Sequence, residues 1–91
     1  MTDRELDEAI RDVLNEFAGL ATDARKLHGN SDLYAAGMTS FASVSVMLGL
    51  EERFAITFPE SVLQRTTFES IRAITNTIAQ LRAESSAAPA S

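Results

Sequence analysis

Apolar residues recur at spacings of three and four along three stretches of this chain, and no other feature constrains its fold as strongly. The stretches span residues 6–17, 41–54 and 68–81. This period places the apolar side chains of a helix on one face, which must then pack against another element. The chain has 91 residues, 45% of them hydrophobic, which is enough for one modest core. We therefore predict a single small all-α domain.

Start and stop signals mark the first of these helices. Thr2 followed by Glu5 fits a capping box, in which the two residues satisfy free backbone groups at the helix start. Gly19 lies where the apolar period ends and is a favourable helix stop. We therefore expect an amphipathic helix that ends close to Gly19. Its apolar face consists of Leu6, Ile10, Val13, Leu14 and Phe17.

A long connection is expected over residues 19–39, which are rich in turn formers such as Asp23, Gly29 and Asn30. Loops of this length in compact domains are usually functional or packed against the core. We expect a short helical turn over residues 32–35. The side chains expected to hold the loop to the core are Leu27, Leu33, Tyr34 and Met38.

The second helix is expected over residues 40–54. Its apolar residues cover more than one narrow stripe, so it is either largely buried or partly exposed for a partner protein. Gly49 lies inside it, although glycine weakens a helix by up to about 1 kcal/mol relative to alanine. This position is therefore expected to pack closely against a neighbouring helix.

A short helix and a final long helix complete the expected fold. Pro59 is expected to open the short helix over residues 60–64, with Val62 and Leu63 facing inward. Residues 66–67 are both threonine and offer an N-cap for the last helix. The apolar positions of that helix are Phe68, Ile71, Ile74, Ile78 and Leu81.

These elements predict a small all-α four-helix bundle of three longer helices and one short helix, with a long first loop. We expect residues 1–82 to form the domain. Residues 83–91 contain no large apolar side chain, and we expect them to be a disordered C-terminal tail.

Composition excludes several classes of function. The chain has no cysteine and a single histidine, His28, so thiol catalysis, disulfides and a zinc site are not expected. Its net charge is −5, its pI is about 4.7 and it has no basic patch, so we expect no binding to nucleic acid. The N-terminal residues are polar and no apolar run could cross a bilayer. The expected protein is a cytoplasmic monomer that binds no membrane.

Ser40 is the candidate functional residue. It follows Asp32-Leu33-Tyr34-Ala35-Ala36-Gly37-Met38-Thr39 at the point where the loop ends and the second helix begins. A hydroxyl there is exposed and lies near the positive end of the helix dipole, which favours a bound phosphodiester. Serine is also a preferred N-cap residue, so position alone is equally compatible with a purely structural role.

The wider pattern resembles the acyl carrier protein family over residues 6–81. Met38-Thr39-Ser40-Phe41 occupies the place of the family's hydrophobic-Asp-Ser-Leu signature. Asp32-Leu33-Tyr34 with Gly37 is similar to the approach to the modified serine. Leu50-Glu51-Glu52-Arg53-Phe54-Ala55-Ile56 resembles the exit from the second helix, and Phe58-Pro59 with Thr66-Thr67-Phe68 resembles the passage into the last one.

The resemblance implies a non-catalytic carrier. A phosphopantetheinyl transferase would attach 4′-phosphopantetheine from coenzyme A to Ser40, using Mg²⁺. A ligase would load an acid onto the arm as a thioester, and an acyltransferase or synthase would receive it downstream. No catalytic constellation is evident in the chain.

The departures from the family pattern indicate a specialised carrier. Thr39 replaces the aspartate that precedes the modified serine, and Phe41 replaces the usual leucine. Residues 41–50 contain no acid, whereas carriers of fatty-acid synthesis have an acidic face there. Long-range electrostatic attraction should therefore be weak, and docking should depend more on shape. Candidate docking residues are Met38, Phe41 and Val44, although core packing is the alternative for each and is favoured for Val44.

We expect a stand-alone carrier that holds an amino acid rather than a bulk fatty-acid carrier. Bulky inward side chains leave little room for a long acyl chain. These are Phe41, Phe54, Phe58 and Phe68. The rival interpretation is a small acidic helical module without a prosthetic group, which binds a basic helix in a groove and uses Ser40 only as a cap.

Overall fold

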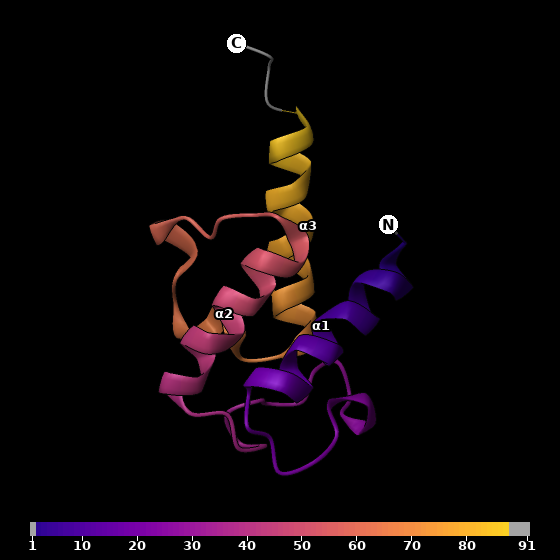
Figure 1. Cartoon of the computed structure of the whole chain (residues 1–91), viewed down its shortest axis with the longest axis vertical. Coiled ribbons are helices and arrows are strands. Elements are labelled where there is room, and N and C mark those ends of the chain that lie inside the picture. The colour runs from indigo at the N-terminus through magenta and orange to yellow at the C-terminus, as the bar shows by residue number, and fades with distance from the viewer. Residues whose placement is uncertain (1, 88–91) are drawn as a thin grey trace.

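The computed structural model describes residues 2–87, which form three α-helices and three short 3₁₀-helices and no strand (Figure 1). The expected all-α bundle is confirmed, except that two 3₁₀ turns stand in place of the short third helix. The elements in chain order are α1 (Asp3–Phe17), η1 (Ala24–Lys26), α2 (Ser40–Phe54), η2 (Glu60–Val62), η3 (Arg65–Phe68) and α3 (Ile71–Ala87).

The helix α1 packs against both α2 and α3. In Figure 1 the loop between α1 and α2 closes one end of the bundle, and the C-terminal part of α3 projects beyond the other end. The segment with η2 and η3 runs along the outer side of α2 on its way to α3. The start of α2 therefore lies at the end of the molecule where the long loop and η3 meet.

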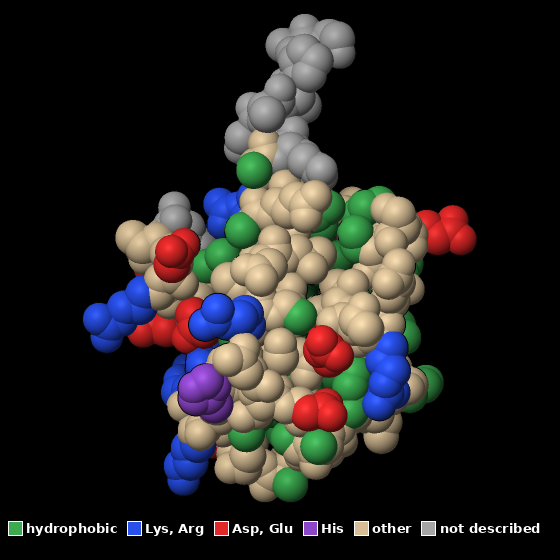
Figure 2. Space-filling model, turned by 180° about the vertical axis from the view of Figure 1, so that it is seen from behind, with side chains coloured by type: hydrophobic (Ala, Val, Ile, Leu, Met, Phe, Trp, Pro, Cys, Tyr) green, Lys and Arg blue, Asp and Glu red, His purple; other side chains and the backbone are tan. Residues whose placement is uncertain are grey.

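The expected cap and stop of α1 are confirmed. Thr2 Oγ1 accepts a hydrogen bond from Glu5 N at 3.2 Å, and Gly19 follows the helix with a φ of 66°. The outer face of α1 is charged and carries the ion pairs Arg4–Glu8 and Arg11–Asp7, and Asp12 reaches Arg25 of η1. Figure 2 shows charged side chains gathered on this side of the molecule, at the left of that view.

Polar contacts attach the long loop to α1. The Arg11 guanidinium donates to the carbonyl oxygens of Ala24 and Leu27 at 2.6 and 2.7 Å. Asn15 accepts from Ala24 N at 2.7 Å and donates to Asp23 at 2.8 Å. The apolar side chains expected to hold the loop do so: Leu33 and Met38 are buried, and Leu27 and Tyr34 pack against the core.

The segment between α2 and α3 differs from expectation. Pro59 is the N-cap of η2 rather than its first residue, and Leu63 is exposed rather than inward. Thr67 Oγ1 donates to Val62 O at 2.6 Å, and η3 covers the threonines expected to cap the last helix. Instead, Ser70 Oγ accepts from Ala73 N at 3.0 Å, so α3 begins later than predicted.

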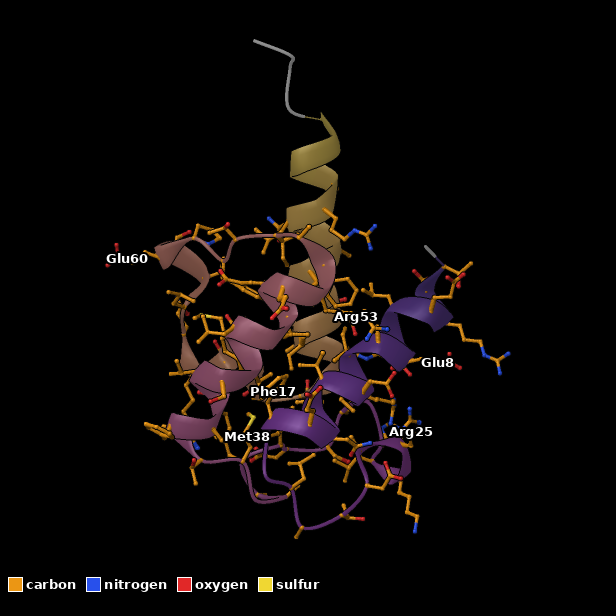
Figure 3. The ribbon with its side chains drawn as sticks, in the orientation of Figure 1. Glu8, Phe17, Arg25, Met38, Arg53 and Glu60 are labelled. Carbon is orange, nitrogen blue, oxygen red and sulfur yellow. The ribbon has the colours of Figure 1, made fainter. Side chains whose placement is uncertain are left out.

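One core joins the three helices and the loop. Its fully buried large side chains are Ile10, Leu14, Leu33, Met38, Val46, Leu50, Ile71, Ile74 and Ile78. Phe58 and Phe68 close it beneath the η2–η3 segment, with ring centroids 5.6 Å apart. The expected close packing at Gly49 is confirmed, because a Cβ there would lie 2.7 Å from Phe17 Cε2 and 3.1 Å from Val13 Cγ1. Phe17 extends from the end of α1 toward α2 (Figure 3).

The helix α3 continues to Ala87, beyond the expected domain boundary at residue 82. Residues 83, 84 and 87 are Ala, Glu and Ala, which are strong helix formers and favour continuation of the helix. Residues 83–87 of the predicted tail therefore belong to α3, and residues 88–91 lie outside the described residues.

Candidate functional site

Ser40 is the first residue of α2, and the N-cap is Thr39. Thr39 Oγ1 accepts from Ala42 N at 2.9 Å, which satisfies a free backbone donor at the helix start. The interpretation of Ser40 as a cap is therefore wrong. Ser40 is exposed, and its hydroxyl has no hydrogen-bond partner among the described residues. It is available for chemistry at no cost to the helix.

The approach to Ser40 is held by backbone contacts. Asp32 Oδ1 accepts from Tyr34 N at 2.9 Å, which makes the expected turn, and Leu33 N donates to Glu69 O at 2.8 Å. Gly37 has a φ of 121°, and a Cβ there would lie 3.2 Å from Ala21 N. Only glycine fits this conformation and this close approach. The loop thus presents Ser40 from a fixed position.

The electrostatic setting of Ser40 favours an anion. The first turn of α2 contains no acidic residue, and no charge occurs along the helix before Glu51. The N-terminal end of a helix carries a partial positive charge and unpaired N–H groups. A phosphodiester on Ser40 would therefore meet no repulsion from this helix.

A cavity of about 320 Å³ opens beside Ser40, between α2 and the η2–η3 segment. Most of its wall is apolar, and the wall includes the buried core residue Phe68. Its described lining residues are Tyr34, Ser40, Ser43, Val44, Met47, Leu63, Gln64, Arg65 and Phe68. An exposed, unpaired hydroxyl at the rim of such a cavity is accessible for covalent attachment of a group that can extend along the cavity.

Three apolar side chains of α2 are exposed in a row, and we call them the apolar ridge. Phe41 is 85% exposed, Val44 53% and Leu48 55%. Their spacings of three and four place them on one face of the helix. Val44 was expected in the core, whereas the opposite stripe of Val46, Leu50 and Phe54 is the buried one.

Other docking predictions need correction too. Met38 is buried beneath the start of α2 (Figure 3), so it belongs to the core and not to the docking surface. Residues 42, 43 and 45 of the same helix are half-buried. The sequence analysis missed Leu48 and Leu63 as exposed residues, and it missed Arg65 in the cavity wall. Residues 41, 44 and 48 follow spacings of three and four on their own, apart from residues 46, 50 and 54, and this pattern could have revealed the ridge.

Residues 8–78 match the model of the phosphopantetheine attachment site family. The chain belongs to this family. Its members are carrier proteins with covalently attached phosphopantetheine, so the cofactor prediction and the non-catalytic carrier role are confirmed. No helix in the described part is long and apolar enough to cross a membrane. No group of three or more potential metal ligands occurs in the same part.

The chain is 47% identical over 73 residues to the aminoacyl carrier protein of Agrobacterium fabrum, which covers 80% of this chain and 88% of that protein. It is 45% identical, with a TM-score of 0.80, to a chain in the crystal structure of an engineered Bradyrhizobium japonicum glycine:[carrier protein] ligase complexed with carrier protein from Agrobacterium tumefaciens and ATP. That match covers 82% of this chain and 97% of the other.

A third match comes from the crystal structure of the Bradyrhizobium japonicum ligase complexed with glycylated carrier protein. There the identity is 25% and the TM-score 0.61, over 82% of this chain and 95% of the other. The expected resemblance to a specialised carrier is therefore confirmed.

Proposed function

We propose that this carrier holds an amino acid as a thioester on a phosphopantetheine arm attached to Ser40 and presents it to partner enzymes of a dedicated pathway. The observation that carries the proposal is the exposed, unpaired hydroxyl of Ser40 at the rim of the cavity. The similarity to an aminoacyl carrier protein supports the class of cargo.

The residues around Ser40 have distinct roles in this proposal. Ser40 Oγ forms the bond to phosphorus and gives up its proton, while the pyrophosphate bond of coenzyme A breaks and adenosine 3′,5′-bisphosphate leaves. Thr39 keeps the first turn of α2 capped. The buried anchors Leu33 and Met38 keep the attachment point fixed relative to the core. The arm supplies a terminal thiol, which this cysteine-free chain lacks, and the amino acid is held there as a thioester.

Three buried phenylalanine side chains of the core support a small cargo. Phe54, Phe58 and Phe68 fill the interior, so the expectation for these three side chains is met, whereas Phe41 points to solvent. This close packing leaves little volume for a long acyl chain inside the bundle, so a load has only the cavity beside Ser40 to enter. An octanoyl load that raised the melting temperature well above that of the glycyl form would contradict this part of the proposal.

We propose that the loading ligase docks on the apolar ridge. The ridge adjoins Ser40, and solved complexes pair similar carrier chains with an amino acid ligase. Because α2 is uncharged before Glu51, its recognition depends on apolar contact rather than on ion pairs. Binding should therefore change little with ionic strength.

A phosphopantetheinyl transferase is the second proposed partner, and Thr39 bears on its choice. Threonine and aspartate both cap helices, so Thr39→Asp should preserve α2 while restoring the acid of the family signature. Faster modification of this variant by a broad-specificity transferase would show that Thr39 restricts recognition. A downstream acyltransferase or synthase, a monomeric state and a cytoplasmic location remain predictions.

The intact mass of the protein tests the attachment site. Incubation with coenzyme A, Mg²⁺ and a broad-specificity transferase should add one phosphopantetheine to wild type and to Ser43→Ala, and none to Ser40→Ala. Ser43 is the matched control because it lines the same cavity. Modification of Ser40→Ala would contradict the assignment. No gain in any sample, with a transferase active on another carrier, would favour the rival interaction module, whose binding surface would be the apolar ridge.

A further inference from the structure

Arg65 is the one charged residue in the described wall of the cavity beside Ser40. Its guanidinium carbon lies 3.8 Å from the centroid of the Tyr34 ring, which is a cation–π contact. The Tyr34 hydroxyl also donates to Arg65 O at 3.2 Å. The two residues are 31 positions apart in the sequence and join the long loop to η3 across the cavity wall.

The Arg65 guanidinium makes no ion pair with a carboxylate in the described part of the chain. The ion pairs found there involve Arg4, Arg11 and Arg25. Stacking on a ring uses the face of the guanidinium and leaves its N–H edge available for hydrogen bonds. The arginine is thus held in place by Tyr34 while its donors remain open to a ligand.

We propose that Arg65, held by Tyr34, is the positioning residue that pairs with the phosphodiester on Ser40. This inference rests on the proposed attachment to Ser40. A phosphodiester keeps its negative charge at neutral pH, and a guanidinium can bind two of its oxygens with charge-assisted hydrogen bonds. The remaining described wall residues are neutral, so no carboxylate there competes for the guanidinium.

The chemistry also selects which part of the loaded arm Arg65 holds. An aminoacyl group ends in a cationic ammonium at neutral pH, which a guanidinium repels, whereas the phosphodiester at the other end of the arm attracts it. Arg65 therefore fixes the base of the arm and keeps the charged end of the cargo away from the cavity wall.

The test compares apo and holo protein by NMR, after intact mass has established that each holo sample carries one phosphopantetheine. In wild type, we expect conversion to the holo form to shift the Arg65 Nε–H resonance and to slow its exchange with water. The ³¹P resonance of the phosphodiester should change between low and high salt, because salt screens the ion pair. This salt dependence should be lost in Arg65→Gln, which has no guanidinium.

Three further variants sharpen the test. Arg65→Lys retains the charge but not the planar fork, so part of the salt dependence should survive. Tyr34→Leu removes the stacking ring and should weaken both effects. Arg72→Gln is the matched control, because this exposed arginine lines a different cavity, and it should behave as wild type.

An Arg65 resonance that does not respond to the arm, in protein whose mass confirms the modification, would overturn this inference alone. A wild-type ³¹P signal in Arg65→Gln, combined with a raised KM for the ligase, would also overturn it and assign Arg65 to docking. The absence of any mass gain would instead overturn the attachment at Ser40, and this inference with it.

Discussion

The helices α1 and α2 have the same length, but their exposed faces differ in chemical character. The outer face of α1 carries ion pairs, whereas that of α2 carries Phe41, Val44 and Leu48. Both helices bury an apolar stripe in the same core. Since large exposed apolar side chains in a row add nothing to folding, their presence on α2 indicates a binding surface. Both helices therefore support the fold, and α2 in addition presents a surface for a partner protein.

The largest expected effect on stability comes from the buried face of α1. Leu14 is fully buried, and Leu14→Ala should lower the free energy of unfolding by about 2–5 kcal/mol, through lost burial and a residual cavity. Urea denaturation followed by circular dichroism measures this change. A loss below about 1 kcal/mol would show that α1 is less central to the fold than the comparison requires.

The apolar ridge should behave in the opposite way. Phe41→Ala should change the free energy of unfolding by less than about 0.5 kcal/mol, because the ring is largely in solvent. It should raise the KM of the loading ligase by about tenfold, since exposed aromatic residues are frequent anchors of interfaces. Glu16→Ala, an exposed position on α1, is the control and should change neither quantity. An unchanged KM for Phe41→Ala would remove the ridge from the ligase interface.

The contact between the two helices at Gly49 should show a smaller effect. Alanine favours the helix, but its Cβ would overlap the Phe17 ring and press on Val13. Because Val13 is buried, we expect Gly49→Ala to be destabilising by about 1 kcal/mol in urea denaturation. Phe17→Leu in the same chain should recover part of this loss. A variant more stable than wild type would mean that Phe17 moves aside freely.

The smallest expected effect involves Asp23, where the long loop meets α1. Hydrogen bonds from Arg25 N and the Asn15 amide hold the pKa of its carboxyl below the usual value. A lowered pKa in the folded state stabilises the protein above the unfolded pKa, and the gain is lost as pH falls through the folded pKa. Wild type should therefore be slightly more stable than Asp23→Asn at pH 7, and the difference should shrink progressively as the pH falls below about 4. A difference that grew on acidification would contradict this assignment.

Sequence patterns predicted the long helices well because their buried faces follow the helical period. The expected bounds of α2 are those observed, with Thr39 as the N-cap and Ala55 in the left-handed conformation after its last residue. The same reasoning failed for Val44, because periodicity identifies two stripes on α2 but not which one faces the core. It also failed for Leu63 and the start of α3, where side-chain hydrogen bonds of Thr67 and Ser70 decide the local structure.

In the candidate site, too, some features could be predicted from the sequence and others could not. Ser40 could be found from a local signature, but the hydroxyl's freedom from capping depends on which neighbour makes the hydrogen bond to Ala42. The pairing of Tyr34 with Arg65 joins distant parts of the chain and leaves no periodic trace in the sequence. The modified serine could therefore be predicted from the sequence, whereas the contacts between the loop and η3 could be found only in the structure.

We propose above all that Ser40 carries an amino acid on its arm. Its most direct test is the mass of holo protein after incubation with ATP, glycine and a glycine:carrier protein ligase, before and after treatment with hydroxylamine. Wild type should gain one glycyl group that hydroxylamine removes, and Ser40→Ala should gain none. A glycyl group that resists hydroxylamine, or that also appears on Ser40→Ala, would contradict it.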